Sequence, residues 1–238
     1  MRPVREQNGQ PWRAWLQAQS QKNPDPVLRD YYRRSVLDPV SAIGDTPLVA
    51  LDFETSGLDP RRDVILSIGL VPFDLSQVYF SQRQQWLLRP PHNYDNESVA
   101  YHHITHTQAL KAPRFESIYA DLLNAIAGHL VVVHYHPIER GFLEQTIKGI
   151  SNAQLRFPLI DTMAIEARRY RHGWRTRLRT LMGQTPVSIR LADSRRRYGL
   201  PNYEGHRAVV DALAGAELLQ AQIQHHYKRS TPIGELWT

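Results

Sequence analysis

The sequence contains no cysteine in its 238 residues. This absence excludes disulfide bonds, thiolate zinc sites and thiol nucleophiles, and it is typical of proteins in a reducing compartment. No stretch approaches the roughly 18 consecutive apolar residues that a membrane span requires. The first ten residues also lack the apolar run of a secretory signal. We therefore expect a cytoplasmic protein that does not contact a membrane.

Three common ligand-binding patterns are also missing. Neither Gly-x4-Gly-Lys nor Gly-x-Gly-x-x-Gly occurs, so nucleotide-driven work and dinucleotide redox chemistry have no support. His-Glu-x-x-His is absent as well. His134 and His136 alternate in an apparent strand over 130–135 and just beyond it, but no third ligand lies at a suitable spacing, so zinc is not expected.

The chain has the composition of a globular protein. Apolar residues make up 42% and charged residues 22%, which excludes wholesale disorder and fibrous structures. A length of 238 residues suits one large domain, or a domain with an appendage.

Positive charge is concentrated in one segment. The net charge is +6, yet residues 166–197 alone contain ten arginines against Glu166 and Asp193, a local excess of +8. Such a patch favours polyanionic partners, nucleic acid above all, because the guanidinium fork suits phosphate oxygens. The alternative is a solvated, arginine-rich helical face.

Residues 1–44 are predicted to form a helical N-terminal extension, followed by the main domain over 45–238. Two groups of apolar residues at helical spacing flank a break at 23–26 that contains two prolines. We expect two short amphipathic helices that dock on the core, or alternatively an arm that binds a polymerase or another protein. The two groups are Trp12, Trp15 and Leu16, then Leu28, Tyr31, Tyr32 and Val36.

The main domain begins with strand patterns and continues with alternating strands and helices. Residues 48–53, 64–73 and 78–88 are typical of an antiparallel meander. A helix over 115–126, a strand over 130–135, a helix over 138–148, a strand over 157–160 and further helices complete the pattern. This order predicts an α/β fold with a mixed sheet flanked by helices.

Asp52 and Glu54 lie where the first apolar strand ends. Side chains alternate between the two faces of a strand, so residues two apart point to the same face, about 6.6 Å apart along the strand. Their oxygens can therefore converge on one divalent cation. A buried acid pair is costly unless it is protonated, paired or neutralised by a metal. The alternative is an ordinary pair that faces a loop.

His206 and Asp211 stand at the start of a long helical pattern. Five helical residues turn through about 500°, so the two side chains cannot share a face of a complete helix. We expect His206 at or before the first turn, from where its imidazole can reach a site that Asp211 enters. The alternatives are a capping or surface histidine and an aspartate on the helix surface.

The segment from Asp52 to Leu58, Asp-Phe-Glu-Thr-Ser-Gly-Leu, combined with the distant His-x4-Asp, resembles the DnaQ-like DEDDh exonucleases of the ribonuclease H-like fold. The resemblance covers about residues 46–225 and includes weaker similarity at 102–105 and 161–162. It implies a 3′-to-5′ exonuclease on a mixed sheet flanked by helices.

A third family motif resembles residues 134–143 but with two departures. Tyr135 stands where the family usually has Asn, and Glu139 where it usually has Asp. Glutamate keeps the charge but reaches one methylene farther, so the metal geometry would differ. We expect retained activity; the alternative is a weakened nuclease-like module that binds nucleic acid or docks on a protein.

The resemblance also implies roles for individual residues. Asp52, Glu54, Glu139 and Asp211 would hold two Mg²⁺ or Mn²⁺ ions, Asp52 bridging both, with His206 as the general base. Substrate contacts would come from Thr55 and Leu58, which line the pocket for the terminal nucleotide, and from His134 and Phe142. For Leu58 a buried turn residue is the alternative. Asp161 is more typical of a helix N-cap than of a catalyst, and His102, His103 and His106 belong to a substrate-facing loop or are satisfied by the backbone.

The sequence thus predicts a metal-dependent enzyme that hydrolyses single-stranded DNA or RNA from the 3′ end and releases nucleoside 5′-monophosphates. The arginine-rich segment would hold the strand behind the reacting end. Proofreading beside a polymerase is a narrower version of the same hypothesis.

Overall fold

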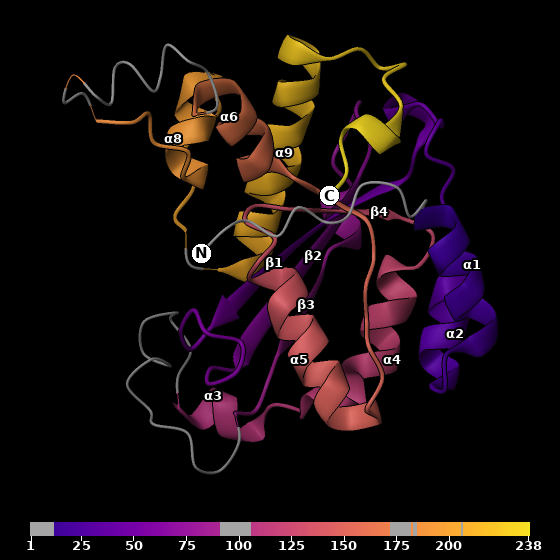
Figure 1. Cartoon of the computed structure of the whole chain (residues 1–238). Helices are drawn as coiled ribbons and strands as arrows, with labels where there is room; N and C mark the ends of the chain where they lie inside the picture. Colours follow the sequence, from indigo (N-terminus) through magenta and orange to yellow (C-terminus); the bar gives the residue numbers. More distant parts are fainter. Residues whose placement is uncertain (1–11, 91–105, 172–181, 183–184, 206) are drawn as a thin grey trace.

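The computed structural model describes residues 12–90, 106–171, 182, 185–205 and 207–238 (Figure 1). Its centre is a mixed sheet with the strand order β3-β2-β1-β4-β5. Strand β1 is antiparallel to β2 and parallel to β4. The strands are β1 (Leu48–Thr55), β2 (Ile65–Phe73), β3 (Gln84–Leu87), β4 (Leu130–Val133) and β5 (Leu159–Asp161).

Helices cover both faces of the sheet. Figure 1 shows α4 and α5 on one side, and α6, α8 and α9 on the other. The helices are α1 (Trp12–Lys22), α2 (Pro26–Arg34), α3 (His106–Lys111), α4 (Phe115–Ile126), α5 (Glu139–Ser151), α6 (Thr162–Tyr170), α8 (Leu191–Arg197) and α9 (Ala208–His226). Among the described ranges, no helix is long and apolar enough to cross a bilayer. The predicted mixed α/β architecture is confirmed.

The central strand β1 divides its side chains between two hydrophobic clusters. Val49, Leu51 and Phe53 pack in the cluster that contains residues of α4 and α5. Leu48 and Ala50 pack in the cluster that contains residues of α9. Because side chains alternate along a strand, Asp52 and Glu54 continue the second set and point toward α9.

The two predicted N-terminal helices are present and dock on the core. Leu16, Tyr31 and Tyr32 are at most 1% exposed and belong to the same cluster as α4. Asp25 caps α2, and the hydroxyl of Tyr119 on α4 donates to its Oδ2 at 2.8 Å. The inner side of this extension is therefore buried, whereas the domain boundary at residue 44 stays a prediction.

The third strand is shorter than predicted from the pattern over 78–88. A side-chain turn precedes it: Asp74 Oδ1 accepts from the backbone N–H of Ser76 and Gln77, and the Tyr79 hydroxyl donates to Oδ2 at 2.6 Å. A 3₁₀ turn, Phe80–Gln82, follows. Regular pairing therefore resumes only at β3.

The fourth strand ends at Val133, two residues earlier than predicted, because Tyr135 has a φ of +93°. His134 and His136 consequently do not alternate on a strand. His134 Nδ1 lies 2.8 Å from Thr162 Oγ1, and His136 Nδ1 lies 2.7 Å from Asp161 Oδ2. The two rings therefore have separate partners.

Candidate active site

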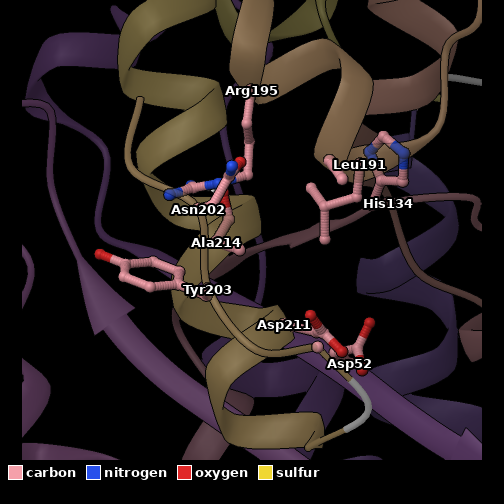
Figure 2. Close-up of a pocket in the computed structure, with 10 residues that line it drawn as sticks. Asp52, His134, Leu191, Arg195, Asn202, Tyr203, Asp211 and Ala214 are labelled. Atoms are coloured by element: carbon pink, nitrogen blue, oxygen red, sulfur yellow. Dashed lines mark hydrogen bonds between the residues drawn. The ribbon is translucent and has the colours of Figure 1, made fainter. Parts of the chain in front are cut away.

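Three carboxylates from two distant parts of the chain meet at the end of β1. One oxygen each of Asp52, Glu54 and Asp211 lies within 4.8 Å of the other two. Figure 2 shows Asp52 and Asp211 next to each other at one end of a pocket. The predicted convergence of the strand pair with Asp211 on α9 is thus present in the structure.

A close backbone crossing brings α9 to this position. In the antiparallel register, Gly69 of β2 lies opposite Asp52. A Cβ built on Gly69 would lie 2.2 Å from backbone atoms of Ala208 and Val209. The first turn of α9, which carries Asp211, therefore packs directly on the backbone of β2.

Glu139 is a fourth acid in the same neighbourhood. It is the first residue of α5 and is 2% exposed. It does not belong to the 4.8 Å group, but its charge acts on Asp52: burial raises the pKa of Asp52 well above its usual range, and Glu139, Asp211 and Glu54 add to the shift. Burial likewise raises the pKa of Glu139, with a further contribution from Asp161.

This set of side chains suits a hard divalent cation. Carboxylate oxygens are the ligands that Mg²⁺ and Mn²⁺ prefer. Like charges held this close are costly unless a cation neutralises them. In addition, Oε2 of Glu139 is buried and has no hydrogen-bond partner among the described residues. The residues present therefore fit a metal centre of the predicted kind.

Asp161 has a structural role at the rim of this site. Its carboxylate caps α6 by accepting from the N–H of Met163 and Ala164. It also accepts from the N–H of Tyr135 and His136 and contacts the His136 ring. Burial alone would raise the pKa of Asp161, but these hydrogen bonds outweigh it and hold the pKa below its ordinary value. The N-cap prediction is confirmed.

His134 lines the same pocket as Asp52 and Asp211. Its Nδ1 lies 2.8 Å from Thr162 Oγ1, and the Thr162 hydroxyl donates to the carbonyl oxygen of Val133 at 3.0 Å. Burial lowers the pKa of His134 to about 4, so the ring is neutral at physiological pH.

The carboxylates open into a cavity of about 410 Å³. Its opposite wall comes from α8 and the loop before α9, which residue spacing alone did not single out (Figure 2). The lining residues are Asp52, His134, Leu191, Ala192, Arg195, Asn202, Tyr203, Gly205, Asp211 and Ala214.

The predicted substrate contacts have different placements. Thr55 is half-buried, and its hydroxyl donates to the carbonyl oxygen of Gly57 at 2.6 Å. Leu58 is 80% exposed, so the alternative of a buried turn residue is wrong. Phe142 is 1% exposed in the hydrophobic core, which corrects the expectation that it contacts substrate.

His206, His102 and His103 lie outside the described residues, as does the side chain of His106.

Two arginines of the basic segment pair with acidic side chains of other helices. Arg195 is 3% exposed and donates to the carbonyl oxygens of Ala214 and Pro201 and to Glu217 Oε2. Arg197 pairs with the buried Glu166. Neither guanidinium is available to hold phosphates as the segment was predicted to do. Arg168, Arg169, Arg171, Arg190 and Arg196 are exposed, and positions 175, 177 and 179 lie outside the described residues.

The sequence matches known exonucleases. Residues 49–219 match the family described as exonuclease of the RNase T type. The chain is 28% identical over 181 residues to DNA polymerase III subunit epsilon of Treponema pallidum, covering 76% of this chain and 78% of that protein. It is 29% identical over 141 residues to the PolC-type DNA polymerase III of Thermotoga maritima, but spans only 10% of that relative's length.

Solved structures share the fold. The nuclease domain of 3′hExo, a DEDDh family member bound to rAMP, aligns with a TM-score of 0.59 at 13% identity over 76% of this chain and 92% of that one. Exonuclease X in complex with 5′ overhanging duplex DNA aligns with a TM-score of 0.57 at 18% identity over 78% and 96%. Cell-death related nuclease 4 aligns with a TM-score of 0.60 at 19% identity, over 77% of this chain and 65% of that one. The fold is therefore the ribonuclease H-like exonuclease fold, and the family match shows that the chain belongs to the RNase T and DnaQ-like DEDDh exonucleases, which hydrolyse phosphodiester bonds.

Proposed function

We propose that this protein is a divalent-metal-dependent exonuclease that trims single-stranded DNA or RNA from the 3′ end and releases nucleoside 5′-monophosphates. The observation that carries the proposal is the convergence of Asp52, Glu54 and Asp211, with Glu139 acting on Asp52, in a chain of this family.

The four acids have distinct roles in this proposal. Asp52 would contact both of two Mg²⁺ or Mn²⁺ ions, Glu54 and Asp211 would complete one site, and Glu139 would support the other. When bound, such ions supply charge stabilisation for the attacking and leaving oxygens of an in-line displacement.

The remaining side chains would handle the proton and the substrate. His206 would accept the proton of the attacking water, which suits a group with an ordinary pKa near 6.5. The exposed Leu58 would wedge against the terminal bases, with Thr55 beside it. His134 would contact the substrate from the cavity wall, and the exposed Arg169 and Arg196 would contact phosphates of the strand.

Two further proposals concern the substrate and a partner. Relatives named as DNA polymerase III components support DNA and proofreading, whereas one structural neighbour is bound to rAMP. A polymerase or another protein partner of the N-terminal extension would contact the exposed Arg13, Ala14 and Gln17 of α1, because the aromatic side of α1 and α2 packs on the core.

The decisive experiment uses 5′-labelled single-stranded DNA and RNA with Mn²⁺, Mg²⁺ or a chelator. We expect a ladder that shortens from the 3′ end and requires metal, and the sugar preference is read from the same gel. Asp52→Ala and Asp211→Ala should abolish it without loss of the fold, whereas Asp121→Ala, an exposed acid on α4, should not. Nuclease activity that survives in both site variants refutes the assignment.

Calorimetric titration with Mn²⁺ separates the enzyme from a module that only binds. The enzyme should bind two ions, and Glu139→Gln should lose one of them. Nucleic-acid binding without hydrolysis and without two bound ions would instead support the binding module.

A further inference from the structure

Tyr203 forms part of the cavity wall opposite the carboxylates. It lies in the loop between α8 and α9 and lines the same cavity as Asp52 and Asp211 (Figure 2). Its side chain is 38% exposed. Thr55 and Leu58 do not line this cavity. Tyr203 and those two residues therefore line different parts of the site.

The ring of Tyr203 is fixed at its hydroxyl and on one face. The hydroxyl donates to Glu217 Oε1 at 2.9 Å. The guanidinium of Arg195 lies over the ring, 4.7 Å from its centroid. Arg195 is itself buried and bound to the other oxygen of Glu217 at 2.7 Å and to the carbonyl oxygen of Ala214 at 2.7 Å. Residues of α8 and α9 thus set the orientation of the ring.

A ring held in this way is suited to stacking. Nucleobases stack on exposed aromatic side chains with about 1–3 kcal/mol per base. A side chain that is already ordered loses little conformational entropy on binding. Because Arg195 covers one face, the exposed part of the ring is left for a ligand. The competing explanation is that Tyr203 merely ties the loop to Glu217 through its hydroxyl.

We propose that Tyr203 is a substrate-positioning residue that stacks on a nucleobase upstream of the terminal nucleotide, and that Arg195 and Glu217 hold it for this purpose. The proposal rests on the proposed function, since it requires a nucleic-acid strand in the cavity. It assigns specificity for strand length to a loop outside the metal centre.

The test compares Tyr203→Ala and Tyr203→Phe on two substrates. One is a short single-stranded oligonucleotide, and the other is the p-nitrophenyl ester of thymidine 5′-monophosphate, which has no upstream base. Tyr203→Ala should raise KM for the oligonucleotide about tenfold or more, and much more than KM for the ester. Tyr203→Phe, which keeps the ring but loses its hydrogen bond to Glu217, should raise KM much less than Tyr203→Ala does. Tyr79→Ala is the matched control, because Tyr79 also donates to a carboxylate but does not line the cavity.

Abasic substitutions separate stacking from a structural role. Removing the stacked base should raise KM for the wild type by a similar factor and should add nothing in Tyr203→Ala. Two results overturn the proposal. One is that Tyr203→Ala and the abasic site raise KM by independent factors that multiply, whichever base is removed. The other is that Tyr203→Phe is as defective as Tyr203→Ala.

Failure of the proposed function gives a different signature. If the wild type hydrolyses neither substrate, the same abasic comparison is made on Kd, measured by fluorescence anisotropy of the oligonucleotide. Stacking then requires that Tyr203→Ala weaken binding and remove the sensitivity to the abasic site. Binding that is unchanged by the variant contradicts stacking independently of catalysis.

Discussion

Gly69 lies opposite Asp52 across the β1–β2 ladder, at the point where the first turn of α9 crosses the sheet. The absence of a side chain at Gly69 is therefore what allows Asp211 to approach the strand that carries Asp52 and Glu54. The geometry of the carboxylate cluster thus depends on a residue with no functional group.

Gly69→Ala should disrupt catalysis more than folding. The new Cβ would contact the backbone of Ala208 and Val209 at 2.2 Å, and no rotamer change can relieve this. We expect a shift of α9, a loss of about 1–3 kcal/mol in stability and a fall in kcat of about a hundredfold or more. Gly215→Ala on the same helix meets nothing within 4 Å and should keep full activity. Equal activity of the two variants would contradict this account.

Asp52→Asn should stabilise the protein in the absence of metal. Burial and the charges of Glu139, Asp211 and Glu54 raise the pKa of Asp52, so its ionised form opposes folding at neutral pH. We expect the Tm in chelator at pH 7.5 to rise by about 2–4 °C. Mn²⁺ should then raise the Tm of the wild type but not that of the variant. Asp121→Asn is the exposed control. If Asp52→Asn had a lower Tm in chelator than this control, the charge of Asp52 would not oppose folding.

The sequence predicts the two carboxylates on β1 better than the rest of the site. Alternation along an apolar strand is a local rule, and it places Asp52 and Glu54 on one face correctly. The approach of Asp211 depends on Gly69, which is 142 residues away in the chain, so only the family resemblance indicated it. Tyr203 and Arg195 carry no periodic signal, because their contacts with Glu217 exist only after α8 and α9 have packed.

The arginine-rich segment shows the same limit. The composition gives the net charge of the segment, but it does not indicate which guanidinium groups pair with buried acids. Arg195 and Arg197 are bound to Glu217 and Glu166, and this pairing requires three helices to come together. Phe142 was similarly assigned to substrate from its place in a motif, whereas its burial is a consequence of tertiary packing.

Glu166 should make stability fall in acid. Burial alone would raise its pKa, but hydrogen bonds from Arg197, Gln222 and Tyr198 outweigh burial and lower it. The folded-state pKa thus lies below the unfolded value near 4.3. The stabilisation is complete above that value and is lost as pH falls through the folded pKa.

Glu166→Gln should therefore cost about 2 kcal/mol at pH 7, and less at about pH 3, because protonation of the folded carboxyl removes the stabilisation. Urea denaturation at both pH values measures the difference, with Asp121→Asn as the exposed control. A cost that is the same at both pH values would rule out the ionised network.

Protonation of His206 should lower the rate of the reaction at acidic pH. A general base must be unprotonated, so kcat/KM with Mg²⁺ should fall below about pH 6.5. His206→Ala should lose about 10²–10⁴-fold in rate and its pH dependence, while His225→Ala, an exposed histidine of α9, should lose neither. A wild-type rate that is flat from pH 5 to 8 would remove His206 from this role.

Tyr135 should carry backbone strain that glycine relieves. Its φ of +93° lies in the region that costs a residue with a Cβ about 1–2 kcal/mol, and the two hydrogen bonds from the N–H of Tyr135 and His136 to Asp161 hold it there. Tyr135→Gly should therefore be more stable than Tyr135→Ala by about 1 kcal/mol. At Asp121, in the middle of α4, Asp121→Gly should instead be less stable than Asp121→Ala, because glycine weakens a helix by about 1 kcal/mol relative to alanine. If alanine were favoured at both positions in urea denaturation, the turn at the end of β4 would not be strained, and the family's usual Asn at this place would need another explanation.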